Sequence, residues 1–155
     1  MDEKVLFFEV IVDAPIESVW QAWTTTEGVK SFFAPDCKLE LRPGGSYEMY
    51  FNLDAPEGLR GGEGCTILAI EERKMLSFTW NAPPEFPKIR EQRTHVYLRF
   101  ASLGASRTKV TFIQDGWGSS TDWLEVYQYF EHAWGQILLP RLQARFKNRP
   151  IQWQE

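Results

Sequence analysis

The side chains that could act as an acid or a base in catalysis are few and scattered. The chain of 155 residues contains two histidines, His95 and His132. Proton transfer needs a group whose pKa is tuned by burial, and the candidates are Glu63, His95 and Asp115. His95 precedes Val96 in an alternating stretch, which predicts an outward-facing side chain. His132 falls on the polar side of a helical segment, so solvent exposure is the simpler interpretation of both histidines.

Motifs for metal, nucleotide or covalent chemistry are missing from the sequence. No spacing of His, Cys, Asp or Glu matches a zinc motif such as H-E-x-x-H. There is no G-x-S-x-G elbow, no P-loop and no G-x-G-x-x-G. We therefore expect no metal, no cofactor and no catalytic residue, and we favour a protein that is not an enzyme over an enzyme.

Aromatic residues are the more distinctive feature. Seven Trp, eleven Phe and five Tyr make up 15% of the chain, more than a small core needs for packing alone. Between residues 119 and 147, one apolar stripe recurs at helical spacing: Trp123, Tyr127, Phe130, Trp134, Ile137 and Leu138. Such a stripe either fills a core or borders a ligand cavity, and residue type alone leaves both interpretations open.

A glycine and a proline interrupt this longest helical segment. Pro140 cannot donate a hydrogen bond to the carbonyl of Gln136, which predicts a bend in the helix. Gly135 would ease that distortion or let another backbone come close. A second apolar row follows, offset from the first: Leu139, Leu142 and Phe146. A bent helix would turn both rows toward the same sheet.

The remaining elements are one strand, a short helical region and six further strands. Residues 3–14 are rich in Val, Ile and Phe, and residues 13–23 change to helical spacing. The six later strand segments are 37–42, 46–53, 65–72, 75–81, 93–103 and 107–115. This order predicts an α+β fold in which an antiparallel sheet is covered by the long C-terminal helix. Without repeats or linkers, residues 1–155 are expected to form one domain.

The loop over residues 81–92 contains three prolines and few strand signals. It is either a rigid connector or a lid over a pocket, with Phe86 and Ile89 as apolar contacts. The sequence does not distinguish these alternatives.

Charge and hydropathy exclude several classes of partner. A net charge of −4 without a basic run argues against nucleic-acid binding. No stretch approaches the roughly 20 apolar residues of a membrane span, and the N-terminal stretch does not match a signal peptide. Cys37 and Cys65 are interpreted as two buried thiols in a reducing compartment. We expect a cytoplasmic protein that does not insert into membranes.

Five segments together resemble a known superfamily. They are "VDAPIESVWQAWTT", "PGGSYEMYF", "GEGCTILAIEERKMLSFTW", "TKVTFIQDGW" and "YFEHAWGQILLPRL". In order and spacing they are similar to the SRPBCC superfamily, with its START or birch-pollen-allergen-like helix-grip fold. Within it, they resemble the subgroup named after the activator of heat shock protein 90 ATPase homologue. One departure is Phe32-Phe33, where the subgroup often has tryptophan.

This resemblance implies a curved antiparallel sheet wrapped around the C-terminal helix, with two short helices after the first strand. It also implies a cavity between sheet and helix that binds a small hydrophobic molecule, lipid-like or aromatic. The positions matching the cavity-lining residues of the superfamily are Tyr47, Met49, Phe51, Trp80, Phe112, Trp123, Tyr127, Phe130 and Trp134.

Two alternatives remain beside ligand binding. One is a cyclase- or dehydratase-like enzyme that uses the same pocket. The other is a module that contacts a chaperone, as an ATPase activator would, or a second copy of itself. Polar groups such as Tyr47, Tyr127 or Gln114 would set the orientation of a ligand.

Overall fold

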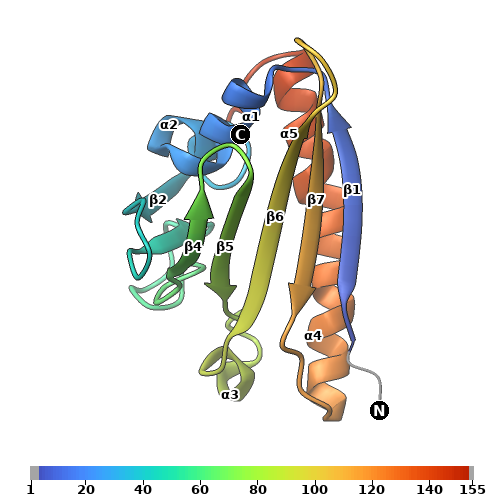
Figure 1. Cartoon of the computed structure of the whole chain (residues 1–155). Coiled ribbons are helices and arrows are strands. Elements are labelled where there is room, and N and C mark those ends of the chain that lie inside the picture. The colour runs from blue at the N-terminus through green and yellow to red at the C-terminus, as the bar shows by residue number, and fades with distance from the viewer. Residues whose placement is uncertain (1–3, 154–155) are drawn as a thin grey trace.

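A twisted antiparallel sheet with a long helix along one face makes up most of the computed structural model, which describes residues 4–153 (Figure 1). The main sheet has five strands in the order β1-β7-β6-β5-β4. Their bounds are β1 Leu6–Val12, β4 Ile67–Glu71, β5 Met75–Trp80, β6 Thr94–Ser102 and β7 Thr108–Asp115. Residues along β7 alternate between buried and half-buried positions, which is the two-residue period that places one face against the core.

A second, two-stranded sheet extends the first. It consists of β2 (Asp36–Leu39) and β3 (Tyr47–Tyr50). The backbone N–H of Tyr47 donates to the carbonyl of Cys65 over 2.9 Å, and that of Gly62 donates to Met49 over 2.7 Å. These bonds join β3 to the chain that leads into β4. The six strand segments expected between residues 37 and 115 are therefore all confirmed.

Short helices follow the first strand, as expected, and one long helical segment ends the chain. The first two are α1 (Ile16–Thr24) and α2 (Thr26–Lys30), and α3 (Pro87–Arg90) lies between β5 and β6. The C-terminal segment comprises α4 (Thr121–His132), the π-helix η1 (Ala133–Leu138) and α5 (Leu139–Lys147). This arrangement is the helix-grip fold, and the predicted fold class is confirmed.

The C-terminal helix changes its winding before the proline rather than at it. Over Ala133–Leu138 the helix is π-helical, and the N–H of Leu139 donates to the carbonyl of Trp134, five residues earlier. Pro140 then falls in the first turn of α5, directly after the π-helical turn, and a π-helical turn can accommodate a residue that lacks a backbone N–H. The wider turn accounts for the offset between the two apolar rows, so the expected distortion is present but has a different geometry from a proline bend.

Gly135 allows a side chain, not a backbone, to approach this helix. A Cβ at residue 135 would lie 2.7 Å from Cε1 of Phe8 on β1, closer than van der Waals contact allows. The ring of Phe8 packs on Phe112 at 6.2 Å, and Phe112 in turn packs on Trp134 at 5.0 Å. The glycine therefore brings η1 down onto the aromatic residues of the sheet.

The core lies between the sheet, the C-terminal helix and α1–α2. Trp23 of α1 is fully buried and packs on Phe32 and Phe33 at 4.9 and 5.5 Å. The hydroxyl of Tyr47 donates to the carbonyl of Trp23 over 2.7 Å and ties β3 to α1. Phe33, directly after α2, reaches from this cluster toward the C-terminal helix.

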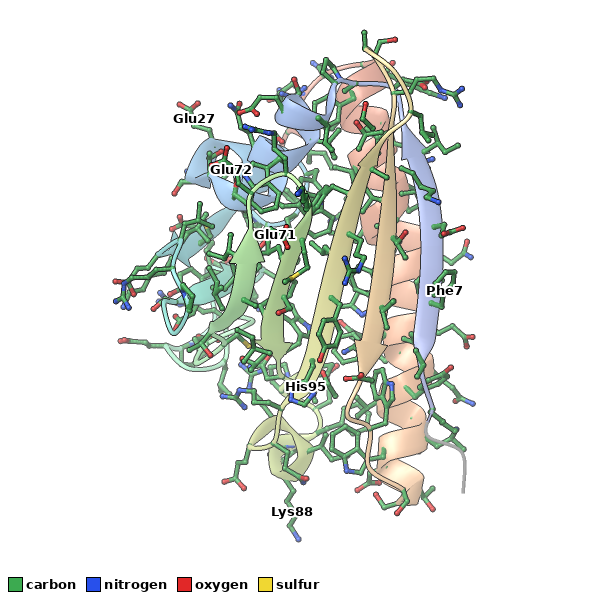
Figure 2. The ribbon with its side chains drawn as sticks, viewed as in Figure 1. Phe7, Glu27, Glu71, Glu72, Lys88 and His95 are labelled. Carbon is green, nitrogen blue, oxygen red and sulfur yellow. The ribbon has the colours of Figure 1, made fainter. Side chains whose placement is uncertain are left out.

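The opposite face of the sheet is exposed to solvent. Phe7 and His95 project from β1 and β6 on this face (Figure 2). Nδ1 of His95 lies 3.3 Å from Oδ1 of Asp115, and Val96 beside it is fully buried. His132 is exposed on α4. The predicted orientations of both histidines are confirmed.

Two further features concern the whole described chain. No helix within residues 4–153 combines the length and the apolar character needed to cross a bilayer. Cys37 and Cys65 are both free thiols, half-buried and buried respectively.

Gly28 sets the close packing of α2 on α1, and its replacement should weaken the fold. A Cβ at residue 28 would collide with the backbone carbonyl oxygen of Gln21 and lie 2.6 Å from Cα of Ala22. Backbone atoms cannot rotate away, so Gly28→Ala should lower the free energy of unfolding by roughly 2 kcal/mol, after the helix-propensity gain of alanine. Urea denaturation measures this loss.

The neighbouring Glu27→Ala is the matched control, since Glu27 is exposed on the same helix. Equal stability of Gly28→Ala and Glu27→Ala would contradict the packing argument.

Candidate functional site

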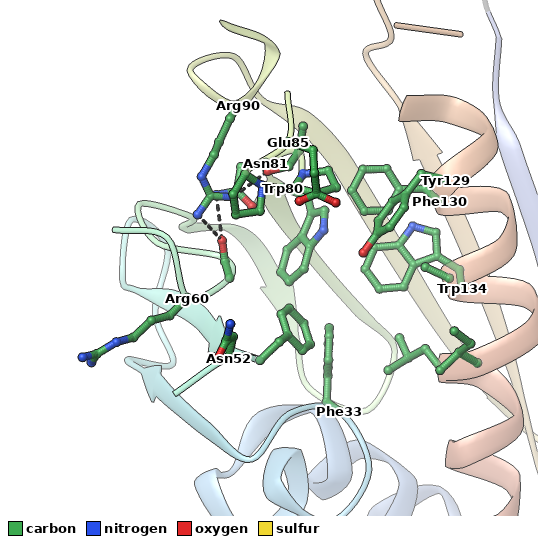
Figure 3. Close-up of a pocket in the computed structure, with 18 of the residues that line it drawn as sticks. Phe33, Asn52, Arg60, Trp80, Asn81, Glu85, Arg90, Tyr129, Phe130 and Trp134 are labelled. Atoms are coloured by element: carbon green, nitrogen blue, oxygen red, sulfur yellow. Dashed lines mark hydrogen bonds between the residues drawn. The ribbon is translucent and has the colours of Figure 1, made fainter. Parts of the chain in front are cut away.

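A cavity of about 410 Å³, partly open to solvent, lies between the C-terminal helix, the end of β5 and two loops. Its volume falls within the range of ligand pockets in proteins. Most of its wall is apolar, and six aromatic side chains contribute to it: Phe33, Phe51, Trp80, Tyr129, Phe130 and Trp134. Figure 3 shows Trp80 facing Phe130 and Trp134 of the helix, with Phe33 below them.

Trp134 is the centre of this aromatic group. Its ring lies 5.4 Å from that of Trp80 and 6.2 Å from that of Phe33. Phe130, one helical turn earlier, stacks on it at 5.4 Å with an angle of 11° between the planes. Each of these rings is almost fully buried, although each also borders the cavity. Core and cavity therefore share one set of side chains.

A chain of buried hydrogen bonds fixes the position of Trp134. Its Nε1–H donates to Oε1 of Gln114 over 2.7 Å, and Gln114 is fully buried on β7. Nε2 of Gln114 donates to Oγ1 of Thr94 over 2.9 Å, and that hydroxyl donates to the carbonyl of Trp80 over 3.3 Å. Because a buried polar group without a partner costs about 1–3 kcal/mol, the chain favours one orientation of the Trp134 indole and ties it to the backbone of β5 at Trp80.

Arg90 of α3 holds the two loops of the cavity together. Its guanidinium donates to the carbonyls of Ala82, Gly58 and Gly61 over 2.6, 2.9 and 2.7 Å. The same group lies 3.1 Å from Oε1 of Glu63. The side chain of Arg90 is only 10% exposed, so these four acceptors replace the water that the cation has lost.

The carboxylate of Glu63 organises the loop beneath it. It accepts hydrogen bonds from the backbone N–H groups of Gly58, Arg60 and Gly61 over 2.8, 3.0 and 2.8 Å. Partial burial raises the pKa of Glu63, but the backbone hydrogen bonds favour the ionised form more strongly. The pKa of this carboxyl is therefore lowered from its ordinary value.

The nine side chains predicted to line a cavity divide into three groups in space. Phe51, Trp80, Phe130 and Trp134 border the cavity. Tyr47, Met49 and Phe112 are fully buried in the core and are not among the residues of its wall. Trp123 and Tyr127 also lie outside the wall, where both pack against Trp117 at 6.3 and 5.0 Å.

The three polar side chains predicted to orient a ligand are not among the residues of the cavity wall. The hydroxyl of Tyr47 is bonded to Trp23, and burial raises its pKa well above the ordinary value. The ring of Tyr127 lies 4.8 Å below Nζ of Lys4. Gln114 acts on the cavity only through Trp134, because both ends of its amide have partners within the protein.

Several wall residues were not predicted. Phe33 was noted only as a departure from the subgroup, and Tyr129 lies outside the apolar stripe of the helix. The 81–92 loop contributes six residues to the wall: Asn81, Ala82, Pro83, Pro84, Glu85 and Arg90. Phe86 and Ile89, proposed as its apolar contacts, pack against the core instead. The density of prolines was the one signal in the sequence that singled out this loop.

The chemistry available at the wall is limited. Glu63, His95 and Asp115, the candidate acids and bases, are not among its residues. Glu85 and Tyr129 are, and burial together with the Glu85 carboxylate raises the pKa of Tyr129, which keeps the phenol neutral. Within residues 4–153, no group of three or more His, Cys, Asp or Glu side chains has a geometry that would hold a metal ion.

The lowered pKa of Glu63 predicts that the loop opens in acid. A carboxyl whose pKa is lower in the folded state stabilises the protein above its unfolded pKa of about 4.3. That contribution is lost as the pH falls through the folded pKa. Hydrogen exchange should show less protection of the Arg60 and Gly61 amides at pH 3 than at pH 7, after correction for intrinsic rates.

The Glu63→Gln variant should show the same loss at pH 7, by about 2 kcal/mol, because a neutral amide accepts weaker hydrogen bonds. The amide of Gly44, bonded to the carbonyl of Ile67 outside this loop, serves as the internal control. Protection that does not depend on pH would show that Glu63 does not hold the loop.

Comparison with solved structures shows the same fold in other proteins. A protein from Mesorhizobium loti superposes with a TM-score of 0.73 at 20% identity, over 96% of this chain and all of that one. The Aha1 dimer from Colwellia psychrerythraea gives 0.69 at 16%, over 94% of this chain and 97% of that one. An Hsp90 activator from Plasmodium falciparum gives 0.68 at 16%, over 90% and 94%. At these identities the likeness is one of fold alone.

The family itself is shown by the sequence match. None of the curated proteins matches the chain. Residues 13–147, however, match the family described as "Activator of Hsp90 ATPase homolog 1-like protein". This region runs from the end of β1 to the end of α5 and contains every residue of the cavity wall. The chain therefore belongs to the activator of Hsp90 ATPase homologue 1-like family, within the SRPBCC superfamily.

Proposed function

We propose that the chain binds a small hydrophobic molecule, aromatic or lipid-like, in the cavity beside Trp134. One observation carries this proposal: six aromatic side chains that pack against one another also border an accessible space of about 410 Å³. An apolar ligand in this space would remove the surface of these rings from water, which is favourable. An apolar guest that buries about 300 Å² would gain roughly 7 kcal/mol before the cost of association.

The rigidity of the wall supports binding further. The Trp134 indole is linked through Gln114 and Thr94 to the backbone carbonyl of Trp80, and the two loops are joined by Arg90 and Glu63. A site whose side chains are already held in place loses less conformational entropy when a ligand enters.

An enzyme that uses the same cavity has less support. The acid and base candidates lie outside the wall, and the Glu63 carboxylate is occupied by backbone N–H groups. His95 and Asp115 face each other on the outer side of the sheet. Catalysis would therefore depend on Glu85, an exposed side chain at the rim.

Contact with a chaperone is the second candidate function. The family description and the Plasmodium falciparum relative both refer to activation of Hsp90. The outer face of the sheet provides an exposed apolar surface, since Phe7 is 57% exposed and pairs in register with Ile113 on β7. Contact with a second copy of the chain has parallel support from the dimeric Colwellia psychrerythraea structure and from β1 as an edge strand.

Binding in the cavity is tested with the neutral fluorescent probe N-phenyl-1-naphthylamine. The wild-type protein should enhance its fluorescence saturably. The Ala133→Trp variant places an indole in the cavity from a half-buried position on η1, and it should weaken binding at least tenfold, about 1.4 kcal/mol.

The control is Leu124→Trp, which adds an indole at an exposed position on α4, outside the wall. Both variants should keep the thermal stability of the wild type to within a few degrees. Equal probe affinity in the wild-type protein and in Ala133→Trp would refute binding in this cavity.

The Ala133→Trp variant also distinguishes a chaperone function from ligand binding. ATP hydrolysis by a purified Hsp90 is measured with the wild-type protein, with Ala133→Trp and with Phe7→Ser. Equal stimulation by the wild type and Ala133→Trp, reduced in Phe7→Ser, would support a surface contact independent of the cavity. Absence of stimulation by the wild type would exclude this candidate.

A further inference from the structure

The charged groups at the cavity wall are predominantly positive. Three arginines and one glutamate belong to it: Arg60, Arg90, Arg141 and Glu85. Arg90 is neutralised by Glu63 and saturated by carbonyl groups. Arg60 donates through Nε to the carbonyl of Ala55, and in Figure 3 its guanidinium points away from the aromatic rings. Arg141 is therefore the cation to consider as a binding group.

Arg141 lies on the cavity side of α5. It follows Ile137 by four residues and Trp134 by seven, and all three belong to the cavity wall. Its side chain is half-buried, and burial lowers the pKa of the guanidinium. The apolar wall next to it leaves this cation in poorer contact with water than a surface arginine.

The C-terminal segment fixes Arg141 from one side. Its Cζ lies 5.2 Å from the centre of the Trp153 ring, a cation–π contact. Trp153 is itself held by its Nε1–H, which donates to the carbonyl of Lys30 over 2.6 Å. The N–H of Ile151 donates to Ser31 over 3.0 Å and returns this segment to α2. The tryptophan therefore positions the cation without neutralising it.

The hydrogen-bond donors of Arg141 have no acceptor within residues 4–153, and no carboxylate of these residues lies within 4.0 Å of it. Glu85, the carboxylate of the wall, belongs to the 81–92 loop and makes no ion pair with Arg141 in the described chain. The Arg141 guanidinium therefore has no counter-ion among residues 4–153, and a carboxylate that reaches it would form charge-assisted, often bidentate, hydrogen bonds.

We propose that Arg141 recognises the anionic group of the ligand, and that the ligand is an apolar acid. Its hydrophobic body would lie among Trp80, Phe130 and Trp134, and its carboxylate or similar oxyanion would meet the guanidinium at the α5 end. This inference rests on the proposed function, because it assigns the chemical class of ligand to the same cavity.

Two probes of nearly equal shape test the assignment. 1-Anilinonaphthalene-8-sulfonate carries one sulfonate, and N-phenyl-1-naphthylamine is the same skeleton without it. The wild-type protein should bind the sulfonate more tightly. Arg141→Gln should weaken sulfonate binding about tenfold, as expected for one charge-assisted hydrogen-bonded pair, and leave the affinity for the neutral probe unchanged.

The matched control is Lys147→Gln, which removes one positive charge from an exposed position on the same helix, outside the wall. It should affect neither probe. Equal weakening of both probes by Arg141→Gln would overturn the proposal, because it would indicate a packing role. Equal binding of both probes by the wild type would also overturn it, while ligand binding itself would stand. If neither probe binds, the proposed function and the inference both fail.

Competition then identifies the body of the ligand. 2-Naphthoate and decanoate are each compared with their primary amides as displacers of bound N-phenyl-1-naphthylamine. Stronger displacement by an acid than by its amide supports recognition of the carboxylate, and the more effective acid shows whether the cavity prefers an aromatic or an aliphatic body. Amides that compete as well as both acids would contradict the inference.

Discussion

The hydrogen bond between Trp134 and the buried amide of Gln114 is the interaction on which the cavity depends most directly. An indole at the boundary between core and solvent could rotate into the empty space beside it and close the cavity. Rotation is unfavourable because it would leave the buried Oε1 of Gln114 without its hydrogen-bond donor. Thr94 extends the same bonding to the backbone carbonyl of Trp80, so one polar chain within an apolar core joins the Trp134 ring to the end of β5.

Ion pairs and hydrogen bonds to charged groups stabilise the loops on the open side of the cavity. Charge-assisted bonds join the loops around Gly58–Glu63 and residues 81–90, in addition to the core packing of Phe86 and Ile89. Glu63 accepts hydrogen bonds from backbone N–H groups, and Arg90 donates hydrogen bonds to backbone carbonyls. The Arg90 guanidinium lies 3.1 Å from Oε1 of Glu63. A loop held in this way keeps its shape without a side chain inserted into the cavity, which leaves the space beside Trp80 accessible.

Much of the fold followed from local pattern. Alternation predicted the strands, and the spacing of Trp123 to Leu138 predicted the helical segment, because each period reports directly on which face is apolar. The winding of that helix was predicted less well: Pro140 indicated a distortion, but the π-turn and the approach of Phe8 to Gly135 depend on β1, more than a hundred residues away. The wall was predicted in part, at Phe51, Trp80, Phe130 and Trp134.

The sequence by itself determined which residues are aromatic, which elements carry them and which face of each element is apolar. Only the tertiary structure decided which of those rings border empty space. Tyr47 and Phe112 face the same interior as Trp80, but neither borders the cavity. Tyr47 packs on Phe78 at 4.4 Å, and Phe112 packs on Trp134 at 5.0 Å. A cavity exists where two layers stay apart, and their separation is set by contacts among distant segments, which no local period records. For the same reason Phe33, Arg90 and Arg141 reach the wall from three separate helical regions.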